Sequence, residues 1–154
     1  TQLDPVLNIA MREVAVTADN PVLILAVREG IVDSVVAINN KDYTVITEIG
    51  YMELGNKIGV VFAPGEIAPE IIFGGGTTKE ESWTKTSWDY PALEDVSPAE
   101  KVVCFGLNND QIGYILPDND IRSMFTENEE INVASTKSGS IITEAFEGLI
   151  ANVK

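Results

Sequence analysis

Hydrophobic and polar positions alternate along this chain in a way that predicts several short strands. Apolar runs rich in β-branched residues, each bounded by Gly, Pro, Asn or Asp, occur at residues 32–38, 43–54, 58–63, 101–107 and 111–116. The second and third runs are separated only by Gly55-Asn56-Lys57. Two β-type runs joined by a short Gly/Asn turn predict a β-hairpin. The first run is expected to end at a turn over residues 39–42.

Helical signals lie between and around these strands. Asp4-Pro5 and Asn20-Pro21 each place a capping side chain before a proline, which is typical of a helix N-terminus. The expected helices are a short one from Asp4-Pro5, a mostly buried one over residues 22–29 closed by Gly30, one from near Ile67 to the glycines at 74–76, and an amphipathic one over residues 138–153.

These elements together predict a mixed α/β (α+β) fold, with an antiparallel or mixed sheet, hairpins and flanking helices. The chain has 154 residues, of which 45% are hydrophobic, so it can form one globular unit with a real core. Residues 74–99 form the least regular stretch, rich in Gly, Thr, Ser and Pro, and we expect an irregular insertion loop there. A loop of this length is usually functional or mobile, and we expect it to be the most mobile segment.

Composition excludes several classes of function. The net charge is −14, with 10 basic and 24 acidic residues, which argues against nucleic-acid binding and against electrostatic docking on anionic membranes. No apolar run approaches the length of a membrane span. The single cysteine, Cys104, lies in an apolar strand and is expected to be a buried, inert thiol. There is no histidine, so this chain alone cannot form a Ser-His or Cys-His pair.

Two polar side chains stand out because each follows directly on a strand and a Gly-containing break. Glu66 follows Pro64-Gly65 after one strand, and Tyr114 follows Gly113 within another. Strand ends that open into such loops often display functional groups. On the residues alone, however, Glu66 also suits a helix cap and Tyr114 a packed aromatic with a satisfied hydroxyl.

The same two segments resemble the later part of the catalytic domain of neutral ceramidases and their bacterial relatives. They read VVFAPGEIAPE at residues 60–70 and VVCFGLNNDQIGYILP at residues 102–117. The resemblance covers residues 43–117 with a gap and implies a zinc-dependent amidohydrolase that cleaves the amide bond of an N-acylated sphingolipid. It implies that Glu66 and Tyr114 are zinc ligands. It also implies a lipid-like amide substrate and a secreted or cell-surface location.

The chain also departs from the family pattern. The family's other two zinc ligands are histidines and its catalytic residue is a serine, all from the earlier half of the domain, and neither motif is present here. The sequence Ile67-Ala68-Pro69-Glu70 after the glutamate is similar to that of a divergent bacterial branch. We therefore expect a C-terminal portion of a longer catalytic domain, completed by the N-terminal part and inactive alone. A start at Thr1 fits a processed or excised piece.

Other residues are assigned weaker roles. Asp110 is a candidate hydrogen-bond partner for the proposed zinc ligands, without contacting the metal itself. Asn108, Asn109 and Asp110 also suit an ordinary turn. Three aromatic residues of the irregular stretch are candidates for an apolar lip around a lipid-like substrate: Trp83, Trp88 and Tyr90. The alternative, which base rates favour, is that they attach the loop to the body of the protein or cover a partner surface. The rival function is a non-catalytic binding or scaffolding module that retains the fold without the metal site.

Overall fold

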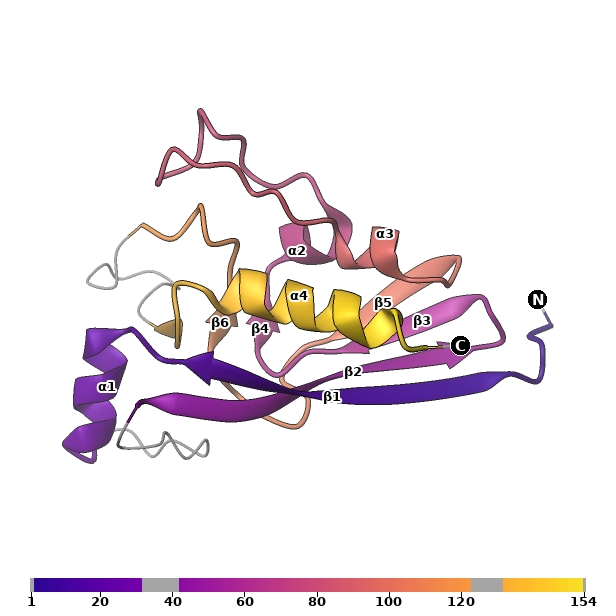
Figure 1. The fold of residues 1–154 in the computed structure, drawn as a ribbon, viewed down its shortest axis with the longest axis horizontal. Helices are drawn as coiled ribbons and strands as arrows, with labels where there is room; N and C mark the ends of the chain where they lie inside the picture. Colours follow the sequence, from indigo (N-terminus) through magenta and orange to yellow (C-terminus); the bar gives the residue numbers. More distant parts are fainter. Residues whose placement is uncertain (1, 32–41, 123–131, 154) are drawn as a thin grey trace.

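The computed structural model describes residues 2–31, 42–122 and 132–153 (Figure 1). Within these residues the fold is mixed α/β, as the sequence predicts. One sheet has the strand order β1-β2-β3-β5, and a separate two-stranded sheet pairs β4 with β6. The strands are β1 (Leu7–Thr17), β2 (Thr44–Leu54), β3 (Ile58–Phe62), β4 (Glu66–Ile67), β5 (Lys101–Phe105) and β6 (Tyr114–Ile115). The first three strands of the large sheet are antiparallel neighbours, whereas β3 and β5 are parallel.

The first element corrects a prediction, because no helix begins at Asp4-Pro5. The chain instead enters β1, which pairs with β2 along its whole length, from Leu7 opposite Leu54 to Thr17 opposite Thr44. A short terminal helix is marginal in water, whereas this pairing places every residue of an 11-residue strand opposite a partner on β2. Long-range strand pairing therefore overrides the local capping signal.

The β2–β3 hairpin confirms the predicted strand–turn–strand pattern. Gly55 and Asn56 both take positive φ angles, of 59° and 57°, which are the backbone angles favoured in tight hairpins. The register runs from Leu54 opposite Ile58 to Gly50 opposite Phe62. The hairpin therefore directs the chain after β3 toward the region where Glu66 lies.

Helix α1 (Pro21–Arg28) begins where the sequence predicts. The Asn20 side chain accepts hydrogen bonds from the backbone N–H groups of Val22 and Leu23, at 3.0 and 3.2 Å, and donates to the Val133 carbonyl at 2.8 Å. The expectation of a mostly buried helix is wrong, because none of its residues is buried. It lies at one end of the β1–β2 pair (Figure 1), where its half-buried Leu23 packs against the core. The strand predicted at residues 32–38 lies outside the described residues.

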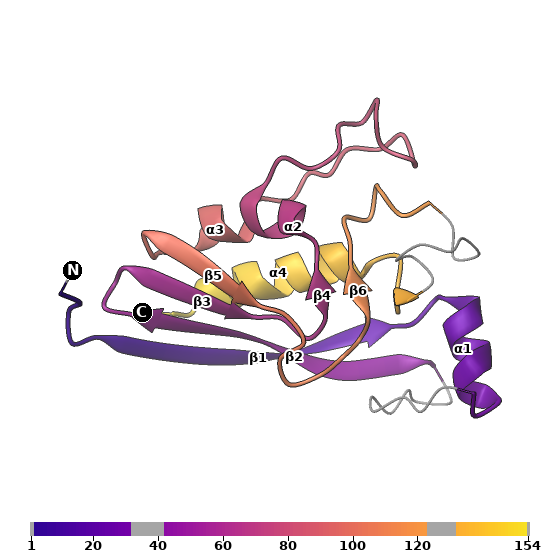
Figure 2. The ribbon, with the colours of Figure 1, turned by 180° about the vertical axis from the view of Figure 1, so that it is seen from behind.

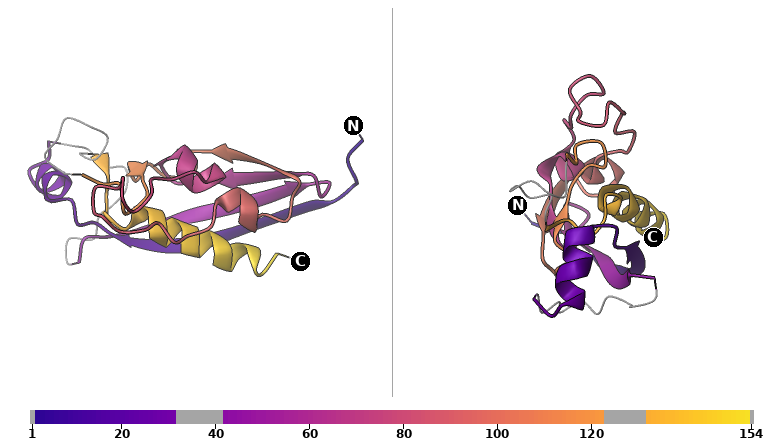
Figure 3. Two further views of the ribbon diagram at one scale, coloured as in Figure 1. Left: turned by 90° about the horizontal axis from the view of Figure 1, so that it is seen from above. Right: turned by 90° about the vertical axis from the view of Figure 1, so that its left-hand side faces the viewer.

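Helix α4 (Ser138–Ile150) confirms the predicted amphipathic C-terminal helix. It packs along β1 and β2, on one side of the sheet (Figure 3), and buries Ile142, Phe146 and Leu149. The Phe146 ring meets the buried Tyr51 of β2 edge to face, with centroids 5.9 Å apart. Two short helices, α2 (Pro69–Phe73) and α3 (Leu93–Val96), contact each other, and α3 also contacts α4. The core therefore lies between one sheet face and this helical layer.

Residues 74–99 contain α3 as their only regular element. Two side chains nevertheless hold the stretch in place. The Ser82 hydroxyl is buried and donates to the carbonyls of Lys79 and Thr86. Asn119, from outside the loop, donates to the carbonyls of Thr77 and Thr86, at 3.2 and 3.1 Å. The greater mobility expected of this segment stays a prediction.

Candidate functional site

Glu66 is positioned by the short strand β4, not by a helix. Its backbone N–H donates to the Gly113 carbonyl at 3.0 Å, and the Ala68 N–H donates to the Ile115 carbonyl at 2.9 Å. These bonds continue the chain as a strand through Ile67, so α2 begins at Pro69, later than predicted. A Cβ atom at position 65 would collide with the Gly113 carbonyl oxygen. Glycine before Glu66 therefore permits the close approach of the two backbones.

Tyr114 is positioned by a second glycine. The predicted strand over residues 111–116 is shorter in the structure, where β6 comprises only Tyr114 and Ile115. Gly113 has a φ angle of +87°, and a Cβ atom there would collide with the carbonyl oxygen of Asn132. Gly113 also forms an isolated bridge with Val133. The backbone on both sides of Tyr114 is thus held by segments from other parts of the chain.

Glu66 and Tyr114 are direct partners in the parallel pairing of β4 with β6. Because residues opposite each other on adjacent strands project from the same face, their side chains lie on one side of this small sheet. Glu66 is exposed and Tyr114 is half-buried. The sequence placed these two residues at neighbouring strand ends, and the structure brings them together.

Both residues line one cleft of about 520 Å³, which is within the usual range for small-molecule sites. Its lining comprises Glu66, Ile67, Ala68, Pro69, Glu70, Thr77, Tyr114, Leu116, Pro117, Asp120 and Arg122. The carboxylates and the guanidinium therefore share the cleft with apolar groups from β4, α2 and the segment after β6. Sequence reasoning missed Glu70, Asp120 and Arg122, because no spacing rule connects them with Glu66 before the fold is known.

Two smaller hollows adjoin this cleft. A hollow of about 270 Å³ shares Glu70 and Thr77 with it and is lined by Trp88 and Tyr90. Another of about 350 Å³ shares Asp120 and Arg122 with it and is lined by Trp83. The three aromatic residues proposed as a lip thus border the region around the Glu66–Tyr114 cleft, in two separate hollows.

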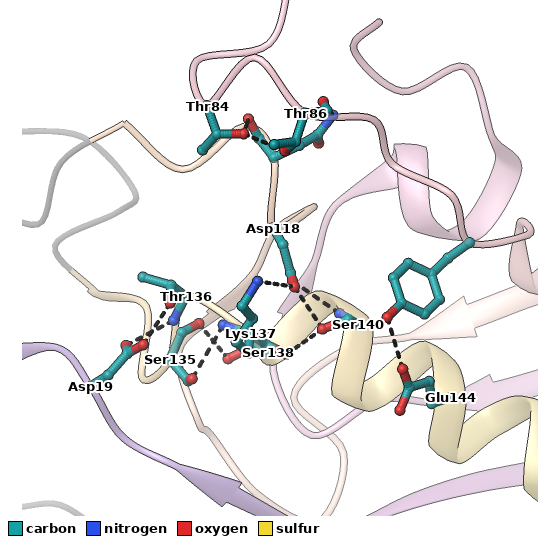
Figure 4. Close-up of polar contacts among 12 residues, drawn as sticks. Asp19, Thr84, Thr86, Asp118, Ser135, Thr136, Lys137, Ser138, Ser140 and Glu144 are labelled. Carbon is teal, nitrogen blue, oxygen red and sulfur yellow. Dashed lines mark hydrogen bonds and ion pairs between the residues drawn. The ribbon is translucent and has the colours of Figure 1, made fainter. Parts of the chain in front are cut away.

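The aromatic side chains of the two hollows differ in how firmly they are held. Trp88 and Tyr90 pack against each other with ring centroids 4.7 Å apart, and the Tyr90 hydroxyl donates to Glu144 of α4 at 2.8 Å (Figure 4). This hydrogen bond raises the pKa of Tyr90 above its ordinary value. Trp83 is 61% exposed. The hollow lined by Trp88 and Tyr90 is therefore fixed to α4, whereas the indole of Trp83 in the other hollow is largely exposed to solvent.

Asp110 lies away from the cleft lining. Its carboxylate accepts a hydrogen bond from the hydroxyl of Thr47, a buried residue of β2, at 2.5 Å. This contact attaches the loop between β5 and β6 to the sheet. The described contacts of Asp110 thus connect it with β2, and the support it was expected to give Glu66 and Tyr114 stays a prediction.

A polar cluster at the N-terminus of α4 fixes one wall of the cleft (Figure 4). The Asp118 carboxylate accepts hydrogen bonds from the Ser140 backbone N–H, at 3.1 Å, and from its hydroxyl, at 2.6 Å. The Lys137 ammonium lies 3.3 Å from the same carboxylate. Asp118 follows Pro117, a cleft residue, directly in the chain. The first turn of α4 therefore anchors the segment that carries Pro117 and Asp120, a role the sequence gave no sign of.

The donor atoms in the cleft fit only part of a zinc site. A carboxylate and a phenol oxygen are hard donors that zinc accepts, but a catalytic zinc needs about three protein ligands besides water. Within the described residues, no group of three or more His, Cys, Asp and Glu side chains could hold a metal ion. With no histidine in the chain, Glu66 and Tyr114 can supply at most half of the ligand set that the resemblance implies.

Comparison with known proteins leaves the family open. No protein-family model, curated protein or solved structure matches this chain. In the part of the chain that the structure describes, no helix has the length and apolar character needed to cross a membrane.

Proposed function

We propose that Glu66 and Tyr114 are two ligands of a zinc centre in an amidohydrolase that resembles neutral ceramidases. The remaining ligands and the nucleophile would come from another part of the catalytic domain, outside this chain. The observation that carries the proposal is the in-register pairing of Glu66 with Tyr114 at the edge of one cleft. The reaction would be hydrolysis of the amide bond of an N-acylated sphingolipid.

The chemistry of the cleft suits this reaction. Bound zinc would polarise the amide carbonyl and lower the pKa of a bound water. The contribution of this chain is to hold one carboxylate and one phenol at a separation determined by β4–β6 pairing. The adjoining hollow of Trp88 and Tyr90 offers ring faces to an apolar chain, and Arg122 offers hydrogen-bond donors to polar substituents.

The rival proposal is a binding module that uses the cleft without metal. Its supporting observation is that the described residues contain no set of three metal-binding side chains. The two proposals differ in what Glu66 does. If Glu66 is a zinc ligand, its conversion to glutamine should abolish zinc binding. If Glu66 only lines a binding cleft, it is one of several carboxylates there, and its conversion to glutamine should have no larger effect than that of Glu70.

The test uses imidazole as a substitute for the missing histidines. Zinc binding to the chain is measured by titration calorimetry with and without imidazole, for the wild type, Glu66→Gln, Tyr114→Phe and Glu70→Gln. Glu70 lines the same cleft but has no pairing with Tyr114, so it provides the matched control. We expect imidazole to tighten zinc binding by roughly tenfold, which corresponds to about 1.4 kcal/mol.

Glu66→Gln should abolish this gain, Tyr114→Phe should reduce it, and Glu70→Gln should retain it. Equal behaviour of Glu66→Gln and Glu70→Gln would contradict the zinc proposal and support the binding module. Zinc-dependent cleavage of short-chain N-acyl sphingosines by this chain alone would also contradict the proposal, because the missing ligands would then be unnecessary.

A further inference from the structure

The face of the large sheet opposite α4 lacks any covering helix among the described elements (Figure 2), and most of its large side chains are apolar. Side chains alternate along each strand, so the residues at alternate positions of β1, β2, β3 and β5 share this face. The charged residues of this face are Glu13, Glu48 and Lys101, and Val60 is its one buried apolar member. The apolar residues are Leu7, Ile9, Met11, Ile46, Met52, Leu54, Ile58, Val60, Phe62, Val103 and Phe105. Of these, Ile9 is 63% exposed, Leu7 59% and Phe105 50%. We call this set the open face.

The open face is continuous from Leu7 to Met11, because its residues stand in rows across the sheet, whereas Ile46 lies beyond the Glu13–Glu48 pair. The pairing places Ile9 beside Met52, then Val60, then Val103. In the next row Phe62 stacks on Phe105, with ring centroids 6.2 Å apart. A monomeric protein rarely exposes a contiguous apolar patch of more than a few hundred Å². Several neighbouring rows of large apolar side chains form the kind of surface that marks a docking site.

Two carboxylates next to the apolar rows of the open face indicate the charge of the partner. They lie between the row of Met11 and the row of Ile46. Glu13 and Glu48 are exposed, and they face each other directly across β1 and β2. Like charges at opposed positions destabilise a strand pair. Neither carboxylate has an ion pair with a described residue. Arg12 lies on the other face, where its guanidinium donates to the Ala145 carbonyl at 3.3 Å. Lys101 lies on the open face but beside Ile58, at the opposite edge of the sheet from β1.

We infer that the open face binds a different protein chain, one with an apolar layer bordered by lysine or arginine side chains that neutralise Glu13 and Glu48. A second copy of this chain fits less well, since it would bring the same acidic pair and another 14 negative charges. An apolar centre with a charged border is the usual composition of a stable protein interface. The inference rests on the sheet alone and does not depend on the zinc proposal.

The test uses three synthetic β-hairpin peptides as probes. One has leucine and valine on one face and lysines along its border, one has the same apolar face with glutamates, and one has the lysines with serines on the face. Binding to the full chain is measured by calorimetry at physiological salt. The basic apolar hairpin should bind, and the other two should bind at least roughly tenfold more weakly, a difference of about 1.4 kcal/mol.

Variants of the chain then locate the contact. Ile9→Glu, at an exposed position that leaves the core intact, should abolish binding of the basic apolar hairpin. The double variant E13Q/E48Q should weaken it severalfold. The double variant E80Q/E94Q changes the net charge equally at exposed positions away from the open face, so it should leave binding unchanged. Circular dichroism checks that each variant is folded.

Several outcomes would overturn the inference. These are absence of binding, equal effects of the two double variants, or equal binding of the serine-faced lysine peptide. Sedimentation measurements provide a further outcome that would overturn the inference. If the chain forms a dimer that Ile9→Glu dissociates, the occupant of the open face is a second copy and the proposed partner is wrong.

Discussion

Glu66 and Tyr114 stand directly opposite each other on two parallel strands that are only two residues long. Such a short pair is not stable by itself, so its geometry depends on what surrounds it. The Ile112 N–H donates to the Pro64 carbonyl at 2.9 Å, and the Leu107 N–H donates to the Gly65 carbonyl at 3.1 Å. These bonds, together with the glycines before each residue, hold the pair in register.

Substitution of Gly113 should therefore disrupt the site more than backbone strain alone explains. Gly113→Ala combines a positive φ angle with a collision against the Asn132 carbonyl, and we expect it to lower the free energy of unfolding by about 3 kcal/mol. Gly75 also has a positive φ, but a Cβ atom there meets nothing within 4 Å, so Gly75→Ala should cost about 1 kcal/mol. Urea denaturation measures both. Equal losses would show that the close contact at Gly113 has no effect.

The Asp118 cap should stabilise both α4 and the cleft wall. Asp118→Ala removes the two hydrogen bonds donated by Ser140 together with the Lys137 ion pair, and we expect a loss of about 1–2 kcal/mol in the free energy of unfolding. Lys137→Ala removes only the ion pair of a lysine whose side chain is 66% exposed, so its cost should be below about 1 kcal/mol. Thermal and urea unfolding compare the two variants. Equal losses for the two variants would mean that the ion pair, and not the hydrogen bonds from Ser140, holds this end of α4.

Stability should fall at alkaline pH, partly because of Cys104. Burial raises the pKa of its thiol from 9.0 to about 11. The unfolded chain therefore loses this proton before the folded chain does, so the contribution is complete below pH 9 and is lost as the pH rises toward 11. Burial also raises the pKa of Tyr51 above its ordinary value of 10.0. Its contribution to the free energy of unfolding is therefore also lost as the pH rises, at a higher pH than that of Cys104.

The free energy of unfolding, measured between pH 8 and pH 10, should decline less steeply for Cys104→Ala than for the wild type. Cys104→Ala should be less stable at pH 8, because it removes part of a packed side chain, so the comparison concerns the slope and not the absolute value. Parallel slopes would contradict the assignment to Cys104. The wild-type thiol should also react slowly with iodoacetamide at pH 8 unless the chain is unfolded.

The fold could be predicted from sequence where the signal is local. Gly55 and Asn56 have the turn chemistry that the hairpin needs, and Asn20 has the side chain that caps α1. Prediction from sequence failed where contacts with distant parts of the chain determine the local structure. Asp4-Pro5 looks like a helix start until β2 is available as a pairing partner. The burial of α1 depends on where the helix lies relative to the core, which its own apolar residues do not specify.

The candidate site likewise has features that local sequence predicts and features that depend on distant contacts. The placement of Glu66 and Tyr114 at strand ends was visible in the sequence, because each follows a glycine at the break of an apolar run. The residues that complete the cleft come from α2, the irregular stretch and the segment after β6. Their convergence depends on tertiary contacts such as the Asp118 cap. The ceramidase-like activity and its zinc stay predictions.

The most direct test of the account is to locate zinc in a crystal of this chain grown with zinc and imidazole. Anomalous diffraction at the zinc absorption edge identifies the metal position without reference to activity. We predict one site in the cleft, with a Glu66 carboxylate oxygen and the Tyr114 phenol oxygen each about 2.0–2.2 Å from the metal and imidazole nitrogens completing the tetrahedron. Zinc bound at Glu70 or Asp120 without Glu66 and Tyr114, or no zinc in the cleft, would contradict it.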